Sequence, residues 1–268
     1  MADWLGLGGK ICVVSGAGGG IGRAIALELA RSGARVAVID LDASSGQATA
    51  DAVAASGGTA VSLACDITNA ESLGAARELL HDQLGPCDIL VNNAALIRAG
   101  RLDGLSLADW DAVMRVNLTG FFLSSQMFAQ DMAQGGSIIH IGSAAGSVPQ
   151  PTSGAYSVSK AGVEMLSRNI AMEWGERGIR SNVVSPAMVI TPMSEVIYRD
   201  PQIRKQREMA VPLRRIGAMQ DIADAVCFLA SDRAGYISGQ EIQVDGGWST
   251  TLLATVPRPG FDTPKSNN

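Results

Sequence analysis

Tyr156 and Lys160 stand four residues apart at the start of a segment with helical spacing of apolar residues. Residues four apart on a helix lie on one face, so the phenol hydroxyl and the ammonium group can reach the same site. A free tyrosine titrates near 10, which is too high for a base at neutral pH, and a nearby cation favours the phenolate. The pair therefore predicts a tyrosine that exchanges a proton near neutral pH.

Ser143 follows the apolar run Ser137–Ile141 and precedes Tyr156 by 13 residues. Ligands of open α/β sheets bind at the carboxyl ends of the strands, which is where this hydroxyl would lie. A tyrosine and a lysine at this spacing also occur on ordinary helix surfaces. Their interpretation as reactive groups therefore depends on a second motif in the same chain.

That second motif is a glycine-rich turn. The apolar run Ile11–Val14 leads into Gly16, Gly20 and Gly22, in the pattern GxxxGxG, and then into an apolar helical segment. Glycines let the backbone approach a pyrophosphate, and the following helix offers free N–H groups and a positive dipole end. The chain contains no GxxxxGK string followed by Ser or Thr, which excludes a nucleotide-hydrolysing P-loop.

Asp40 ends the run Arg35–Asp40 and lies 18 residues after Gly22. This is close to the spacing of about 20 expected for a carboxylate that binds the adenosine ribose. A carboxylate repels a 2′-phosphate, and Leu41 and Asp42 supply no arginine, so NAD is favoured over NADP. Asp40 as a helix cap is the alternative, but Asp42 and Ser44 suit that role better.

The elements that must position these residues alternate between strand and helix. Short apolar runs separated by helical segments predict parallel strands buried on both faces, joined by right-handed crossovers. The expected fold is an α/β, doubly wound Rossmann sheet of about seven strands with helices on both faces. The predicted strands are Ile11–Val14, Arg35–Asp40, Ala60–Cys65, Ile89–Val91, Ser137–Ile141, Ile179–Val184 and Glu241–Val244, and the clearest helices are Ile21–Ala30, Ser72–Leu84 and Val163–Met172.

The chain has 268 residues, which fits a single domain of this class. We expect one catalytic domain over residues 1–250 and a tail of little order over 251–268. Within the domain, residues 189–216 are rich in proline and arginine and suggest a mobile flap over the substrate.

Composition excludes several classes of function. The net charge is −5 with no basic run, so no nucleic-acid partner is expected. The four cysteines have no CxxC spacing and only two histidines are present, which argues against a metal site. Residues 1–10 lack the pattern of a signal peptide, and no run approaches the roughly 20 apolar residues of a membrane helix. We expect a cytoplasmic protein without a membrane partner.

Taken together, these motifs resemble the short-chain dehydrogenase/reductase family over nearly the whole chain from Gly9 to about Trp248. Further elements that carry the resemblance are Asp66 with Ile67, the stretch Asn92–Ala95, Asn117, the segment Pro186–Thr191 and the stretch Gly239–Gly247. The resemblance implies a catalytic set of Asn117, Ser143, Tyr156 and Lys160. It implies a cofactor site of Gly16, Gly20, Ile21, Gly22, Asp40, Leu41, Asp66, Ile67, Asn93, Ala94, Ala95, Tyr156, Lys160, Pro186, Val189 and Thr191, and substrate contacts at Ser143, Ala145, Tyr156 and Met188.

The activity that the resemblance implies is hydride transfer between NAD and a secondary alcohol or ketone. Tyr156 would exchange the proton, Ser143 would bond the reacting oxygen, Lys160 would hold the nicotinamide ribose, and Asn117 would hold a relay water. A homotetramer is also implied. Ala95 and Ala187 depart from the family, which usually has glycine there, and this raises the question of the backbone path near the nicotinamide.

Three alternatives stay open. One is an NADPH-dependent 3-ketoacyl reductase of the same fold, which would usually carry a basic residue in the glycine turn or just after Asp40. Another is an enoyl reductase, in which the tyrosine and lysine are separated more widely than here. A third is a non-catalytic NAD-binding sensor, against which the complete set of Ser143, Tyr156 and Lys160 argues. Apolar neighbours of the site favour a small, cyclic or polyol substrate.

Overall fold

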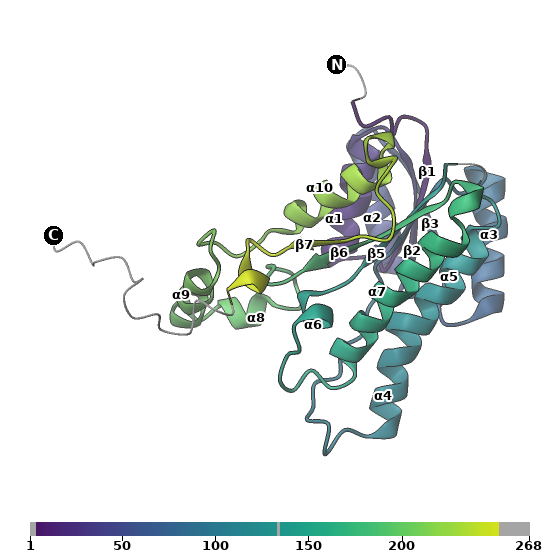
Figure 1. Ribbon diagram of the computed structural model, residues 1–268. Coiled ribbons are helices and arrows are strands. Elements are labelled where there is room, and N and C mark those ends of the chain that lie inside the picture. The colour runs from purple at the N-terminus through teal and green to yellow at the C-terminus, as the bar shows by residue number, and fades with distance from the viewer. Residues whose placement is uncertain (1–3, 133–134, 252–268) are drawn as a thin grey trace.

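One sheet of seven parallel strands forms the centre of the computed structural model, which describes residues 4–132 and 135–251 (Figure 1). The strands follow the spatial order β3-β2-β1-β4-β5-β6-β7. Their bounds are β1 Ile11–Ser15, β2 Arg35–Asp40, β3 Thr59–Ala64, β4 Ile89–Asn92, β5 Ser137–Ile141, β6 Arg180–Pro186 and β7 Glu241–Val244. The predicted fold is confirmed, and predicted and observed strand ends differ by two residues at most.

The order of the strands fixes where a ligand can bind. The chain runs outward from β1 through β2 to β3, and then returns to the other side of β1 with β4. At such a switch point the loops after two neighbouring strands diverge and leave a crevice at their carboxyl ends. The glycine turn follows β1 and the Asn93 loop follows β4, so both lie at this crevice.

Helices cover both faces of the sheet (Figure 1). One layer contains α1 (Gly20–Arg31), α2 (Ala43–Ala55) and α10 (Met219–Ala230), and the other contains α3 (Ala70–Gln83), α5 (Gly120–Phe128) and α7 (Tyr156–Glu173). The shorter helices are α4 (Leu107–Met114), α6 (Ala144–Ser147), α8 (Glu195–Tyr198) and α9 (Pro201–Ala210). Asp42 caps α2 by accepting the Ser44 N–H at 2.9 Å, as predicted, which leaves Asp40 for the crevice.

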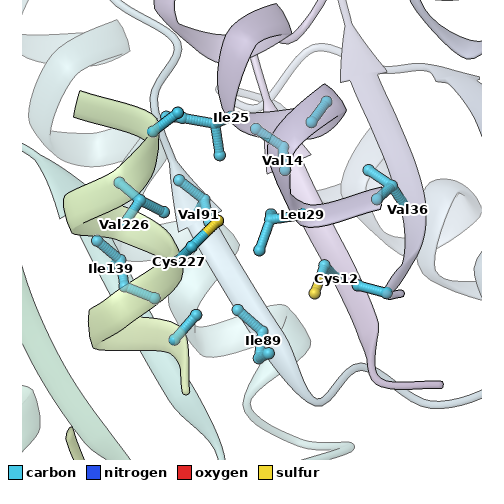
Figure 2. Packing of buried hydrophobic residues seen from close by; sticks show 14 of the residues in the cluster. Cys12, Val14, Ile25, Leu29, Val36, Ile89, Val91, Ile139, Val226 and Cys227 are labelled. Carbon is cyan, nitrogen blue, oxygen red and sulfur yellow. The ribbon is translucent and has the colours of Figure 1, made fainter. Parts of the chain in front are cut away.

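The core on the α1 side is made of small and branched side chains. Ile25 and Leu29 of α1 pack with Val226 and Cys227 of α10 above the strands (Figure 2). All four cysteines are free and buried, and burial raises the pKa of the Cys227 thiol to about 12. These thiols are therefore packing residues that stay protonated.

The expected flap over residues 189–216 contains two helices, α8 and α9. Asp200 caps α9 through the N–H groups of Gln202 and Ile203, and Pro201 takes the first position of the helix, where proline costs no hydrogen bond. Pro201 thus marks a helix start within the segment that we expected to be a mobile flap.

The expected tail lies outside the described residues except for Thr251. No helix of the described chain is long and apolar enough to cross a bilayer.

Asp131 joins α3 to the end of α5, and we use it to test the packing of this layer. Its carboxylate accepts hydrogen bonds from Arg77 Nε at 2.7 Å and His81 Nε2 at 2.6 Å, and only 3% of the side chain is exposed. Burial alone would raise the pKa of Asp131, but the bonds from Arg77 and His81 outweigh it and hold the pKa below 3.8. We expect Asp131→Asn to lower the free energy of unfolding by about 1–3 kcal/mol at pH 7.

Because the folded pKa is depressed, this stabilisation is complete above about pH 4 and is lost as the pH falls through the folded value. Thermal melts of wild type and variant should therefore converge in acid. Asp103→Asn, which removes an exposed pair with Arg101, is the control and should change little at any pH. A constant difference between wild type and Asp131→Asn from pH 7 to pH 3 would contradict this assignment.

Candidate active site

The turn between β1 and α1 forms an open cradle. Gly16 and Gly20 have φ values of +61° and +56°, which glycine adopts without strain. A Cβ at Gly19 or Gly20 would meet nothing within 4 Å, and both residues line the main cavity. No side chain caps α1 and its first turn has no acid, so its N–H groups are available to an anion.

Gly22 has a different role from the other glycines. A Cβ there would lie 2.3 Å from the Gly16 carbonyl oxygen and 2.5 Å from Asn93 Nδ2. Asn93 Nδ2 donates to the carbonyl oxygens of Ser15 and Gly16, both at 3.0 Å. Gly22 therefore lets α1 pack against the turn and the loop after β4, and it does not itself line the cavity.

Asp40 is fixed at the end of β2. Its Oδ2 accepts the Gly18 N–H at 2.8 Å and its Oδ1 accepts the Asp42 N–H at 3.0 Å. Its side chain lines the cavity beside Leu41. A carboxylate is thus held at the point where the sequence predicts contact with the adenosine ribose.

Asn117 holds the loop after β4. It lies in a single π-helical turn, Arg115–Thr119, between α4 and α5 and is fully buried. Its Oδ1 accepts the Leu96 N–H at 2.7 Å, and its Nδ2 donates to the Leu96 carbonyl at 2.9 Å and to Ser159 Oγ at 3.1 Å. Both N–H groups of the amide are used, so the side chain fixes the loop and has no N–H left to orient a relay water.

Ser143, Tyr156 and Lys160 come together at the carboxyl end of β5. Ser143 caps α6, where its Oγ accepts the Ala145 N–H at 3.1 Å, and hydrogen bonding from Ser143 lowers the pKa of Tyr156. Lys160 Nζ lies 5.7 Å from the centre of the Tyr156 ring and 5.1 Å from that of Phe121. The expected shared face of the helix is thus observed.

The electrostatics differ from the sequence expectation that Lys160 lowers the pKa of Tyr156. Burial raises the pKa of Tyr156 above 10.0, and the bond from Ser143 opposes this. Burial also lowers the pKa of Lys160 to about 7, and its Nζ donates to the Ile141 carbonyl oxygen at 2.7 Å. A lysine that is only partly charged at neutral pH, with its proton directed to the backbone, exerts little pull on the phenol.

One cavity of about 1010 Å³ contains both the glycine turn and the reactive hydroxyls. Of the predicted residues, Asn117, Ala145 and Met188 do not line it, and neither does Gly22; Ala145 is buried, and the Met188 carbonyl oxygen accepts the Gly217 N–H at 2.9 Å. The predicted residues that do line it are Gly16, Gly20, Ile21, Asp40, Leu41, Asp66, Ile67, Asn93, Ala94, Ala95, Ser143, Tyr156, Lys160, Pro186, Val189 and Thr191.

Sequence reasoning missed several lining residues from loops without a motif. Gln150 lies between α6 and α7, and Ser194 and Ile197 lie at the start of α8. Ile97, which was also missed, is an exposed apolar side chain at the cavity, and its signal in the sequence is only its position after β4. Met193, expected in the flap near the substrate, lines the cavity and is 70% accessible.

The two alanines that replace family glycines cause no backbone strain. Among the described residues, Thr152 and Arg214 are the non-glycine positions with positive φ. Ala95 and Ala187 therefore adopt conformations open to any L-residue, and both line the cavity.

These features fit a dinucleotide. The space beside Gly19 and Gly20 is open, and a side chain at either position would occupy it. The uncapped N–H groups at the start of α1 can bind a pyrophosphate in this space. Asp40 and Asp66 border the adenosine end, while Tyr156 and Lys160 border the other. The arrangement can bind a dinucleotide and move a proton at the far end.

A family model described as Enoyl-(Acyl carrier protein) reductase matches residues 16–249. The chain is 38% identical to D-threitol dehydrogenase of Mycolicibacterium smegmatis over 91% of this chain and 94% of that protein. It is 37% identical to 7alpha-hydroxysteroid dehydrogenase of Escherichia coli over 92% and 96% of the two chains.

Solved structures agree with these matches. A gluconate 5-dehydrogenase of Burkholderia cenocepacia, in complex with NADP and tartrate, superposes with a TM-score of 0.87 at 31% identity, over 92% of this chain and 98% of that one. A short-chain alcohol dehydrogenase described as putative, from Sinorhizobium meliloti, gives 0.87 at 34% identity, with the same coverage of both chains.

The two kinds of glycine in the turn give a paired prediction. Gly22→Ala forces a Cβ against backbone and Asn93, so we expect it to destabilise the protein by about 1–3 kcal/mol. Gly19 has an extended backbone with φ of −163°, so Gly19→Ala should melt at the wild-type temperature and bind NADH at least about tenfold more weakly, because its methyl group fills the cradle. Thermal melts without cofactor and NADH fluorescence titrations measure both effects. Wild-type NADH affinity in Gly19→Ala would show that the cradle is not the pyrophosphate site.

Proposed function

The chain belongs to the short-chain dehydrogenase/reductase family, and from this we propose that it is an NAD-dependent oxidoreductase that interconverts a secondary alcohol and its ketone. The observation that carries the proposal is that Ser143, Tyr156 and buried Lys160, whose Nζ lies 5.7 Å from the Tyr156 ring centre, line the same cavity as the glycine turn. A sensor that only binds NAD would have no need of this constellation.

The nicotinamide ring, when bound, supplies the hydride acceptor or donor of the reaction. In oxidation Tyr156 takes the proton of the substrate hydroxyl, and in reduction it returns a proton to the carbonyl oxygen. Ser143 Oγ accepts the Ala145 N–H, and its single O–H, which is directed to Tyr156 in this structure, would turn to the reacting oxygen when substrate binds. That donation stabilises negative charge on the oxygen as the bond to carbon changes.

Lys160 holds a position from which its ammonium can bond a ribose hydroxyl. Lys160 would hold the nicotinamide ribose through Nζ, and a second acceptor besides the Ile141 carbonyl would favour its charged form, which in turn would favour the phenolate of Tyr156. Asn117 acts as a positioning residue: it ties the Leu96 loop to Ser159, and Ser159 Oγ donates to the Tyr156 carbonyl at 2.7 Å.

Asp40 supports NAD as the preferred cofactor. Its fixed carboxylate faces the cavity at the adenosine end, and a 2′-phosphate placed there would meet a negative charge. The gluconate 5-dehydrogenase with bound NADP shows that the fold also accepts the phosphorylated cofactor. An NADPH-dependent ketoacyl reductase is the alternative, and the Tyr156–Lys160 spacing of four argues against an enoyl reductase despite the description of the family model.

The substrate class that we propose is a small uncharged or polyol alcohol, in line with relatives named for threitol and hydroxysteroids. Exposed apolar side chains at the cavity, including Ile97 and Met193, favour a partly apolar compound. We further propose a homotetramer located in the cytoplasm, with the catalytic domain over residues 1–250 and the segment 189–216 selecting the substrate.

Ser143→Ala tests the electrostatic assignment. Hydrogen bonding from Ser143 lowers the pKa of Tyr156, so its removal should raise that pKa. The rate of alcohol oxidation should then reach its maximum at a higher pH. We expect kcat to fall about 100-fold and the midpoint of the pH profile to rise by about one pH unit, the equivalent of one hydrogen bond. Ser157→Ala, one residue after Tyr156 and outside the cavity, should keep the wild-type profile. An acid shift in Ser143→Ala would refute the assignment.

Asp40 is tested by cofactor preference. In the wild type, kcat/KM with NAD should exceed that with NADP about 100-fold, because the Asp40 carboxylate repels the 2′-phosphate of NADP. Asp40→Asn keeps one acceptor for the turn and removes the charge, so it should reduce the preference about tenfold. Asp51→Asn, on the exposed surface of α2, should leave the ratio of kcat/KM values unchanged. Preference of the wild type for NADP would overturn the cofactor proposal.

A further inference from the structure

The reactive end of the cavity is bordered by three segments. They are residues 95–97 after β4, Gln150 between α6 and α7, and residues 192–197 at the start of α8. Ser143 and Tyr156 flank the segment that carries Gln150, so a substrate bonded to the two hydroxyls lies next to this part of the chain.

The charges around the cavity are unequally distributed. Among the described residues that line it, the acids are Asp40 and Asp66 and the one lysine is Lys160, with no arginine or histidine. Lys160 is 1% exposed and its Nζ donates to the Ile141 carbonyl, so it is not placed as a counter-ion for substrate. Arg98 follows Ile97, but its side chain is 55% exposed and faces Asp109 at 3.7 Å.

This distribution disfavours an anionic substrate. A carboxylate or phosphate that leaves water for such a site needs a cation or several N–H donors in return, and the desolvation cost is otherwise large. The reactive end is therefore suited to a neutral molecule.

Gln150 supplies the free polar group at this end. Gln150 is exposed at the cavity, and its side-chain amide has no hydrogen-bond partner within the described chain, whereas the Asn93 amide donates both N–H groups to the glycine turn. The Gln150 segment is fixed to the chain after Ile97, because Gly100 N donates to the Thr152 carbonyl at 2.9 Å and Gly154 N to the Gly100 carbonyl at 3.1 Å. An amide both donates and accepts, and so does a hydroxyl.

Apolar side chains line the same cavity as this amide. Leu96 and Ile97 come from the loop after β4, and Met193 and Ile197 come from the start of α8. The site therefore offers one reactive pair of hydroxyls, one neutral amide and an apolar wall.

We propose that the substrate is an uncharged diol or hydroxyketone with an apolar carbon skeleton, and that Gln150 selects it by bonding the second oxygen. The inference rests on the proposed function and specifies the substrate class of the same site. In oxidation, the C–H bond of the reacting carbon breaks and its hydrogen passes with both electrons to NAD⁺. The O–H proton passes to Tyr156 and then to water, a C=O bond forms, and the second hydroxyl stays intact.

The test uses two matched sets of substrates, with NADH formation as the readout. The cyclic set is trans-1,2-cyclohexanediol, cyclohexanol and trans-2-hydroxycyclohexanecarboxylate, and the linear set is 2,3-butanediol, 2-butanol and 3-hydroxybutyrate. In at least one set, we expect kcat/KM for the diol to exceed that for the mono-alcohol about tenfold, the equivalent of one hydrogen bond. It should exceed that for the hydroxy acid about 100-fold.

Variants assign the effect to Gln150. Gln150→Leu should lower kcat/KM for the diol about tenfold and leave the mono-alcohol unchanged, so that their ratio approaches one. Gln150→Arg should raise kcat/KM for the hydroxy acid. Gln83→Leu, at the end of α3 and away from the cavity, is the matched control. NADH affinity should stay at the wild-type value in all three variants, which shows that they are folded.

The outcomes separate this inference from the proposed function. If the hydroxy acid is turned over at or above the rate of the diol, the inference is wrong, but the proposed function as an alcohol dehydrogenase stands. An equal effect of Gln150→Leu on diol and mono-alcohol removes Gln150 from substrate selection. If both sets are inert but other secondary alcohols react, the substrate class is wrong, and if no alcohol or ketone reacts although NADH binds, the proposed function itself fails.

Discussion

A lysine ammonium buried without a carboxylate partner is the constraint on which this site depends. Lys160 is 1% exposed, and within the described chain its Nζ is held by the Ile141 carbonyl and the face of Phe121. Burying such a group is costly, and here the cost appears as a pKa lowered to about 7. A group in this state responds strongly to any new acceptor, such as a ribose hydroxyl. In the proposed function, this lysine would couple cofactor binding to the phenol beside it.

The surrounding fold holds one strand end and the starts of two helices around that lysine. β5 supplies the Ile141 carbonyl and leads to Ser143, α7 supplies Tyr156 and Lys160, and α5 supplies Phe121. His140 stacks on Phe121 with ring centres 5.9 Å apart, and burial lowers its pKa to about 3. It therefore stays neutral and adds no second positive charge near Lys160. Asn117 completes the unit by linking the loop after β4 to the first turn of α7.

Local patterns were sufficient to predict the fold and the centre of the site. Strands such as β1 are buried on both faces, so their apolar runs and the glycines after them are visible in the sequence. The spacing of Tyr156 and Lys160 fixes a shared helix face whatever the tertiary packing is. The place of Asp40 at the crevice also followed, because Asp42 is the better cap for α2.

What the sequence did not predict depends on contacts between distant segments. Gln150 carries no motif, and its place at the cavity arises from hydrogen bonds between Gly100 and residues 152 and 154. Gly22 was assigned to the cofactor site by its motif, but its packing against Gly16 and Asn93 is visible only in three dimensions. The pKa values of Tyr156 and Lys160 likewise follow from burial, which the spacing of residues does not report.

The most direct measurement of the central claim is turnover and NADH affinity in Tyr156→Phe. The substitution removes one hydroxyl and keeps the ring that packs near Lys160. If the phenol exchanges the substrate proton, kcat for a secondary alcohol falls by about 1000-fold or more, while the dissociation constant for NADH stays within about twofold of wild type, because the glycine cradle is intact. Turnover above about a tenth of the wild-type rate would contradict the account, since loss of a proton-transferring group costs far more than that.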